Sequence, residues 1–159
     1  MQERGSEQRA LFRRWPAGVS VVVTELDDRR AGLTVSSLTS LSLEPPLVGI
    51  SIALDASLHE LLRHSGEWTA SVLAGDQEHL AQHFARSVPP IALWNGVEVR
   101  EDDPRLLAGA AGWLTARTVQ EIRTGDHTFF VGEVLDSGFL KDEDTEVLRM
   151  EDTRMNYGG

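Results

Sequence analysis

Residues 31–46 read AGLTVSSLTSLSLEPP and carry six hydroxyl side chains within nine positions. A glycine precedes these hydroxyls, and two prolines at the end of the stretch lead directly into an apolar run. Short hydroxyls beside free backbone N–H groups can surround a phosphate or a flat heteroaromatic ring without adding charge. A Ser/Thr-rich edge strand that binds nothing is the alternative interpretation. The six residues are Thr34, Ser36, Ser37, Thr39, Ser40 and Ser42.

The segments on either side of this stretch have the pattern of β-strands. Residues 19–24 are a β-branched run closed by a polar turn, so we expect them to pair antiparallel with the hydroxyl-rich segment as a second strand. Residues 47–54 alternate, with large apolar side chains on one face and Gly49, Ser51 and Ala53 on the other. A face of small residues lets a flat ligand approach the backbone; tight packing beneath a helix is the alternative.

Short helices are predicted at three places. Residues 7–15 fit a short amphipathic helix that ends at Pro16. A capping-box pattern at residues 57–60 predicts the start of a second helix, which Gly66 ends. Asp76 is the expected N-cap of a third helix.

The remaining strands fall in the second half of the chain. Residues 68–73, 113–122 and 128–135 have strand patterns, and a turn at residues 124–126 joins the last two. Residues 92–112 are expected to be largely irregular. Mostly antiparallel strands with a few short helices predict a mainly β fold, built as a small closed barrel.

Composition limits the classes of function. The chain has 159 residues, 41% of them hydrophobic, so residues 1–159 are expected to form a single domain with a buried core. The lack of cysteine excludes disulfides, thiolate chemistry and Cys-ligated metals, and it fits a cytoplasmic protein. The net charge of −10 argues against nucleic-acid partners, because phosphate backbones are bound by clustered Lys and Arg.

No membrane partner is expected either. The N-terminal sequence MQERGSEQRALFRRW lacks the apolar core of a signal peptide. No apolar run approaches the roughly 20 residues of a membrane-spanning helix. Six acidic residues near the C-terminus predict a solvated surface; they are Asp142, Glu143, Asp144, Glu146, Glu151 and Asp152.

Histidine is the residue type most open to a catalytic or ligand-binding role. His79 and His83 have the spacing of a zincin pair, but no glutamate lies between them at the required position and no third ligand is evident, so no metal site is expected. His127 follows a Gly-Asp turn at the start of a strand, from which its side chain could reach into a barrel mouth. From spacing alone, a turn histidine bonded to its own hairpin is favoured. No nucleophile elbow, P-loop or GxGxxG is present.

Taken in order, these motifs resemble those of the short-chain flavin reductases. Besides residues 31–46, the matching segments are FRRWPAGVSVVVT at 12–24 and EHLAQHFA at 78–85. The third is GDH at 125–127, followed by FVGEV at 130–134. The resemblance covers nearly the whole chain, and the hydroxyl stretch together with Gly-Asp-His is its specific part.

The resemblance implies an FMN-binding split β-barrel, an antiparallel, Greek-key-like fold with a few short flanking helices. It also implies hydride transfer from NADH or NADPH to FMN or FAD, which requires neither a nucleophile nor a metal. Members of this family form homodimers with the flavin near the subunit interface. Many release reduced flavin to a separate flavin-dependent monooxygenase, the partner expected here.

Two groups of cofactor-binding residues follow from the resemblance. The first would line the flavin ring and ribityl chain and form the strand on which they rest: Thr34, Val35, Ser36, Ser37, Ser51 and Ile52. In the second group, Ser57 would bind the flavin phosphate at a helix N-terminus, where free N–H groups favour an anion. His83, Phe84 and Arg86 would lie near the phosphate or the adenine, with Arg86 as the charge partner. His127 resembles the histidine on the nicotinamide side and is the candidate catalytic residue, expected to orient NAD(P)H or flavin without donating an obligatory proton.

The chain departs from the family pattern at two places. Residues 94–96, Trp-Asn-Gly, stand where relatives carry an aromatic residue and glycine after the second helix. The C-terminal region offers residues 147–150 and a lone Tyr157 in place of an aromatic-rich segment, so the nicotinamide side is expected to differ more than the flavin side. Two other functions are compatible with the same fold. One is an electron carrier or one-component oxidase that retains its flavin; the other is a non-catalytic module that binds flavin or haem.

Overall fold

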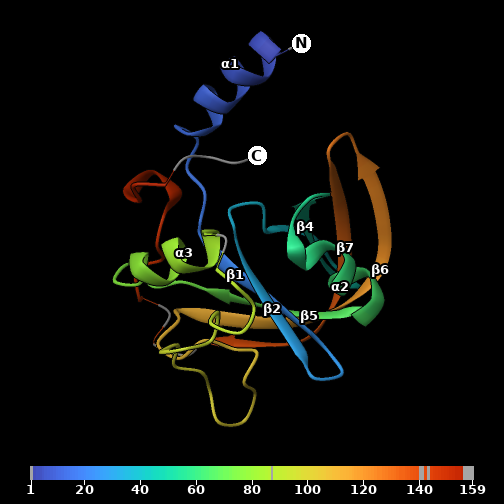
Figure 1. Ribbon diagram of the computed structural model, residues 1–159, viewed down its shortest axis with the longest axis vertical. Coiled ribbons are helices and arrows are strands. Elements are labelled where there is room, and N and C mark those ends of the chain that lie inside the picture. The colour runs from blue at the N-terminus through green and yellow to red at the C-terminus, as the bar shows by residue number, and fades with distance from the viewer. Residues whose placement is uncertain (1, 87, 140–141, 143, 156–159) are drawn as a thin grey trace.

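The computed structural model describes residues 2–86, 88–139, 142 and 144–155, and Figure 1 shows how their helices and strands are arranged. Glu143 and Tyr157, both named above, lie outside the described residues. The elements in chain order are α1 (Gln2–Phe12), β1 (Ser20–Leu26), β2 (Arg29–Val35), β3 (Thr39–Leu43), β4 (Pro46–Ala53), α2 (Ser57–Ser65), β5 (Glu67–Val72), α3 (Glu78–Ala85), β6 (Gly112–Thr124), β7 (His127–Phe139) and the 3-10 turn η1 (Met150–Asp152).

The strands form one curled antiparallel sheet in the order β2-β1-β5-β6-β7-β4-β3. Curling brings β2, at one end of the sheet, into contact with β4 near the other end. The result is an open barrel: within the described residues, the two end strands, β2 and β3, do not pair with each other. The prediction of a mainly β, antiparallel barrel with a few short helices is confirmed. The barrel is split, as the family resemblance implies, and not closed as the strand pattern predicted.

The hydroxyl-rich segment forms two strands, whereas the sequence pattern predicted one. Its first part, ending at Val35, pairs with β1 as expected. Its second part, β3, pairs with β4 on the opposite side of the split. Residues 36–38 cross between the two strands, and the Ser37 hydroxyl bonds to the backbone of Ser51 in β4. Serine hydroxyls compete with strand pairing for backbone groups, which gives a physical reason for the break.

Two hydrophobic cores lie on either side of β1. Val22 faces the barrel interior, where it joins a cluster that includes Trp68 and Phe130. Val21 and Val23 face the other way, into a cluster with Phe84 of α3. Because β1 is buried on both faces, its sequence is a continuous β-branched run with little alternation.

Three helix starts differ from the prediction. Helix α1 begins at Gln2, ends at Phe12 and projects away from the barrel (Figure 1), so it buries no amphipathic face. Helix α2 has Ala56 at its N-cap and no capping box, because the Glu60 carboxylate bonds to His59 and Arg63. In helix α3 the N-cap is Gln77, whose side-chain amide accepts a hydrogen bond from a preceding backbone N–H, and Asp76 is left outside.

The C-terminal region returns to the barrel. Val147 and Arg149 form isolated bridges with Ala74 and Gly18. The predicted solvated surface is confirmed for Asp142, Asp144, Glu146, Glu151 and Asp152, which are all exposed. Leu148 and Met150 are nevertheless buried in the cluster beside β1. Among the described residues, no helix combines the length and the apolar character needed to cross a lipid bilayer.

A buried histidine ties α2 to the start of β7. His59 is only 3% exposed, and its Nδ1 lies 3.0 Å from the Glu60 Oε1, an oxygen that can only accept. Its Nε2 therefore accepts the hydroxyl proton of Thr128, at 2.7 Å. The edge of the His59 ring contacts the Phe130 ring, with 5.6 Å between centroids. This hydrogen bond is the polar link between the helix and the strand that begins with His127.

We expect Thr128→Val to lower the free energy of unfolding by about 1–3 kcal/mol, because the buried His59 nitrogen loses its donor. Valine keeps the shape and strand preference of threonine, so the change isolates the hydroxyl. Urea denaturation measures the loss, with Thr128→Ser as the control that keeps the hydroxyl. Equal losses for the two variants would contradict this account.

Candidate functional site

A cavity of about 300 Å³ opens where the sheet is split; we call it the small cavity. Its walls come from β2, the residue 36–38 crossing, β4, the start of β7 and the C-terminal region. Six of the predicted site residues meet here: Thr34, Val35, Ser36, Ser37, Ser51 and His127. The structure thus brings together segments that lie up to 93 positions apart in the chain.

The four hydroxyls of the small cavity have two different roles. Thr34 donates a hydrogen bond to the Ala81 carbonyl at 2.7 Å and so fastens β2 to α3. The Ser37 hydroxyl donates to the Ser51 carbonyl and accepts from the Ser51 N–H, at 3.2 and 3.0 Å. The side-chain hydroxyls of Ser36 and Ser51 make no hydrogen bond within the described part of the chain, so both are available to a ligand.

The small-residue face of β4 packs against a phenyl ring of β7 at one end, not beneath a helix, and lines the small cavity at the other. Phe129 lies over Gly49, where an added Cβ would come within 2.2 Å of the phenyl Cζ. Glycine is required there for tight packing of the ring. Ser51 and Ala53, further along the same face, line the small cavity and leave room for a ligand.

His127 begins β7 directly after the turn at Gly125, which has a φ of 67° that favours glycine. Its Nδ1 lies 2.7 Å from Oδ1 of the neighbouring Asp126, and its side chain is 16% exposed. The ring thus bonds to its own hairpin and also lines the small cavity, and its role in binding or catalysis stays a prediction. With Nδ1 engaged, Nε2 is the ring nitrogen left for a ligand.

The imidazole of His127 holds the pKa of the Asp126 carboxyl below its ordinary value, through their side-chain hydrogen bond first and charge attraction second. A lowered folded-state pKa contributes stability that is fully present above the ordinary carboxyl range and is lost as pH falls through the lowered value. We therefore expect wild type to exceed Asp126→Asn in stability near neutral pH. The difference should shrink when urea denaturation is repeated in increasingly acid buffer; a difference that grows would contradict this sign.

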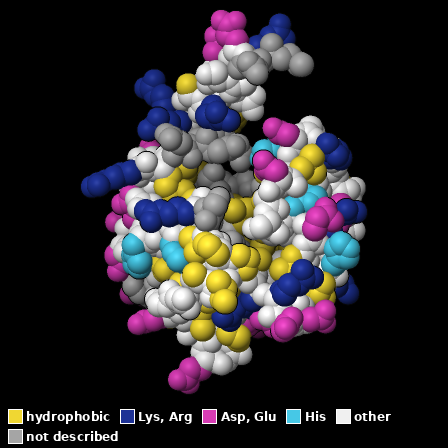
Figure 2. All heavy atoms as spheres, in the orientation of Figure 1, with side chains coloured by type: hydrophobic (Ala, Val, Ile, Leu, Met, Phe, Trp, Pro, Cys, Tyr) yellow, Lys and Arg dark blue, Asp and Glu magenta, His cyan; other side chains and the backbone are white. Residues whose placement is uncertain are grey.

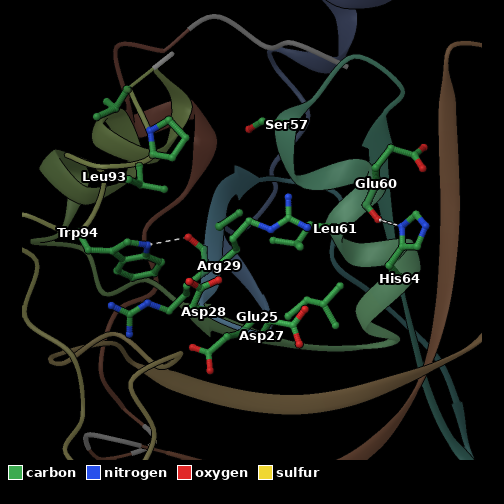
Figure 3. Close-up of a pocket in the computed structure, with 15 residues that line it drawn as sticks. Glu25, Asp27, Asp28, Arg29, Ser57, Glu60, Leu61, His64, Leu93 and Trp94 are labelled. Atoms are coloured by element: carbon green, nitrogen blue, oxygen red, sulfur yellow. Dashed lines mark hydrogen bonds between the residues drawn. The ribbon is translucent and has the colours of Figure 1, made fainter.

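A larger cavity of about 740 Å³, the large cavity, lies between α2, the β1–β2 turn and residues 88–94. Figure 2 shows hydrophobic side chains gathered on this face with charged groups around them. Ser57 lies at its rim, and the Arg29 side chain extends into it toward Leu61 (Figure 3). Trp94 forms one wall: its Nε1 donates to the Arg30 carbonyl at 2.9 Å, and the Arg30 guanidinium lies 4.0 Å from the ring centroid.

The start of α2 contributes consecutive residues to the linings of both cavities. Ala56 lines the small cavity, whereas the next residue, Ser57, lines the large one. Ser57 is the first residue of the helix, so its free backbone N–H groups lie at this boundary. The predicted phosphate position therefore adjoins the predicted ring position.

Two predicted residues have their side chains in the cores. Ile52 is fully buried on the face of β4 that points away from the small cavity. Phe84 is 2% exposed and packs against Trp94, with 5.3 Å between ring centroids. It also fills the space above Gly32, where an added Cβ would lie 2.8 Å from the phenyl ring. Both side chains therefore support the walls from the cores and do not line the small cavity.

The other predicted residues of α3 also lie away from the small cavity. The Nε2 of His83 donates to the Leu93 carbonyl at 2.6 Å and so anchors the loop that carries Trp94. Arg86 is exposed just after the helix and lines neither cavity. His79 is exposed, and no three His, Asp or Glu side chains of the described segments are grouped as a metal site requires.

Sequence reasoning missed three residues that line the cavities. Met150 and Met155 reach the small cavity from the C-terminal region, which had been singled out only as a departure from the family pattern. Arg29 lies in the large cavity, although the sequence suggested only a polar turn there. The local sequence holds no signal for any of the three, because the folded chain alone brings them to the cavities.

Comparison with known proteins agrees with this architecture. The profile of the Flavin reductase like domain matches residues 12–159. The NADH:FMN oxidoreductase of Rhodococcus erythropolis is 37% identical over 132 residues, which cover 80% of this chain and 67% of that protein. The reductase component of the FADH(2)-dependent resorcinol hydroxylase of Rhizobium sp. (strain MTP-10005) is 35% identical over 135 residues, covering 82% and 75%. The solved NADH:FAD oxidoreductase SgcE6 of Streptomyces globisporus C-1027 has a TM-score of 0.82 at 34% identity, covering 92% and 87%.

Fold, cavities and relatives together define an NAD(P)H-dependent oxidoreductase that reduces flavin. The chain belongs to the flavin reductase-like family, and the match runs from the end of α1 to the C-terminus.

Proposed function

We propose that the small cavity binds the isoalloxazine ring of FMN or FAD and that the protein there passes hydride to it from NADH or NADPH. One observation carries the proposal: the free hydroxyls of Ser36 and Ser51 and the ring of His127 converge on a single cavity. Relatives whose names specify NADH with FMN, and NADH with FAD, support the choice of both substrates.

The small cavity fits a flat, uncharged ring with polar edges. Ser51 and Ala53 present short side chains over which a ring can lie, and the thioether side chains of Met150 and Met155 form an apolar wall. Neutral hydroxyl and backbone donors can bind the carbonyl and nitrogen edge of such a ring and stabilise negative charge that develops there. The described lining contains one carboxylate, that of Asp55. Because its negative charge repels an anion, the site does not favour an anionic ring before reduction.

The flavin phosphate belongs at the start of α2 in this arrangement. Ser57 and the free N–H groups of the first helical turn favour an anion by hydrogen bonding and by the helix dipole. Arg29 points into the large cavity, which Ser57 also lines, and it is a cation available to that position (Figure 3). Arg86, the cation inferred from the resemblance, is exposed and would have to fold back to join it.

The chain's own residues orient the reactants. When bound, flavin supplies a ring that accepts a hydride together with a proton. His127 holds its Nδ1 against Asp126 and presents Nε2 to the nicotinamide or to the flavin edge. Phe129 packs over Gly49 on the same face of β4 and so supports the strand that carries Ser51. Positioning of this kind is what hydride transfer chiefly requires of a protein.

The proposal also includes the state in which the protein acts. A second copy of the chain would form a homodimer with the flavin near the interface, as the family resemblance implies. Residues 1–159 act as one domain, because the small cavity draws residues from Leu33 to Met155. The reduced flavin passes to a separate monooxygenase, in keeping with a relative named as the reductase component of a hydroxylase. We place this exchange in the cytoplasm, where NADH and NADPH are available.

The direct test is oxidation of NADH and NADPH, followed by the loss of their absorbance, with FMN, with FAD and without added flavin. We expect a rate that saturates with free flavin, and the preferred pair identifies both substrates. Flavin that copurifies and is not exchanged during turnover would instead indicate a carrier or oxidase. Binding of flavin without oxidation of either nicotinamide would overturn the proposal.

A further inference from the structure

Two methionine side chains enter the small cavity from the C-terminal region. Met150 is fixed by its backbone, since its N–H donates to the Ala17 carbonyl at 2.8 Å. Leu148, two residues earlier, exchanges backbone hydrogen bonds with Val19 and Leu73. This pairing carries the chain across the mouth of the split barrel, where Met150 and Met155 face the residues proposed to hold the flavin ring.

The two thioethers differ in exposure and in how firmly they are held. Met150 is 6% exposed and belongs to the cluster beside β1. Met155 is partly exposed and packs on the outside of that cluster. Its N–H donates to the Thr153 hydroxyl at 3.3 Å, and the N–H of Arg154 donates to the Glu78 carboxylate at 3.0 Å. Met155 is therefore the more exposed of the two methionines that line the cavity, and its described neighbours are tied through Thr153 and Glu78.

We propose that Met155 is an oxidation site, modified by hydrogen peroxide that forms in the small cavity when reduced flavin meets oxygen instead of the monooxygenase. The inference rests on the proposed function, because it needs reduced flavin in this cavity. Reduced flavin gives two electrons and two protons to O₂, which yields oxidised flavin and hydrogen peroxide. Thioethers that are exposed near a source of peroxide are the ones oxidised to sulfoxide.

The oxidation balances without a further reactant. A sulfur lone pair of Met155 attacks one peroxide oxygen, the O–O bond breaks, and an S–O bond forms. The second oxygen leaves as water with both hydrogens. Sulfur is oxidised by two electrons and the peroxide is reduced by two. The product is a polar sulfoxide in place of an apolar wall.

A polar sulfoxide at this position should loosen the segment that covers the cavity. Met155 packs against the apolar cluster that holds Leu148 and Met150, and a polar sulfoxide weakens that apolar packing. The segment would then separate more readily from Glu78 and from the cavity. We expect weaker retention of flavin, so that a reductase working without its partner lowers its own output of peroxide.

The first experiment maps sulfoxide by peptide mass spectrometry during NADH oxidation with flavin in air. We expect Met155 to gain one oxygen about fivefold faster than Met150, and to keep doing so when catalase removes peroxide from the bulk solution. Equal rates at the two residues would overturn the proposal. Complete protection by catalase would also overturn it, because the peroxide would then come from solution. The initial rate of NADH oxidation in the same sample tests the proposed function separately.

A second experiment avoids nicotinamide altogether. Flavin reduced beforehand with hydrogen over palladium is mixed with the protein without air, and oxygen is then admitted. Preferential sulfoxide at Met155 supports the proposal even if NADH is not a substrate, and its absence overturns it. The Met155→Leu variant, compared with wild type after each is normalised to its own initial rate, should lose activity more slowly over many turnovers. An unchanged rate of decline would show that oxidation of Met155 has no consequence.

Discussion

Ser51→Leu is expected to weaken flavin binding by about 100-fold, equivalent to about 2.8 kcal/mol. The Ser51 side chain lines a cavity of only about 300 Å³ together with Ser37 and His127. Leucine would occupy the space in which we place the ring and would remove one of the two free hydroxyls. The backbone groups that bind the Ser37 hydroxyl remain, so the strand keeps its anchor.

Fluorescence titration of FMN and FAD measures this loss, and urea denaturation shows whether the barrel still folds. Ser40→Leu is the matched control, because Ser40 lies in the same hydroxyl-rich stretch but is exposed on β3. We expect the control to bind flavin as wild type does. Wild-type affinity in Ser51→Leu itself would move the ring out of the small cavity, with the large cavity as the next candidate.

The parts of this fold that could be predicted are those set by local patterns. The β-branched run of β1 is visible in the sequence because both faces of that strand are buried. The alternation along β4 is visible because burial on one face dictates it. The meeting of the hydroxyl stretch with His127 could be expected only through the resemblance to a family. Neither segment shows by itself which strand it will pair with.

The parts that could not be predicted depend on competition between several possible partners for one side chain. The capping box predicted at Ser57 does not form because the Glu60 carboxylate bonds to His59 and Arg63. The hydroxyl stretch breaks at Ser37 because that hydroxyl replaces a strand partner for Ser51. In each case a side chain with a strong preference for a local hydrogen bond bonds to a different partner in the folded chain.

The spacing of residues along the sequence also does not show which side chains will line a cavity. Arg29 belongs to the strand after a tight turn, yet the curl of the sheet directs it into the large cavity (Figure 3). Met150 and Met155 follow a segment whose sequence resembles no family motif. The backbone of residues 147–150 pairs with the segments at the start of β1 and the end of β5, which places Met150 at the site. Departures from a family pattern can thus supply site residues of their own.

His127→Ala is expected to raise the KM for NADH about tenfold, equivalent to about 1.4 kcal/mol, with little change in kcat or in flavin affinity. The imidazole is placed by its own hairpin, through the Asp126 carboxylate, so its free Nε2 can bind a ligand without movement of the chain. Loss of a group that binds the nicotinamide equally before and during hydride transfer changes KM alone.

Steady-state kinetics with NADH at saturating flavin measure the change, and His79→Ala is the control because His79 is exposed on α3. Asparagine at position 127 keeps a short polar side chain, so His127→Asn should recover part of the affinity. If His127→Ala leaves both kcat and KM for NADH unchanged, His127 has no part in the reaction. If kcat falls and KM does not, the imidazole acts in the transition state, and proton donation replaces orientation as its role.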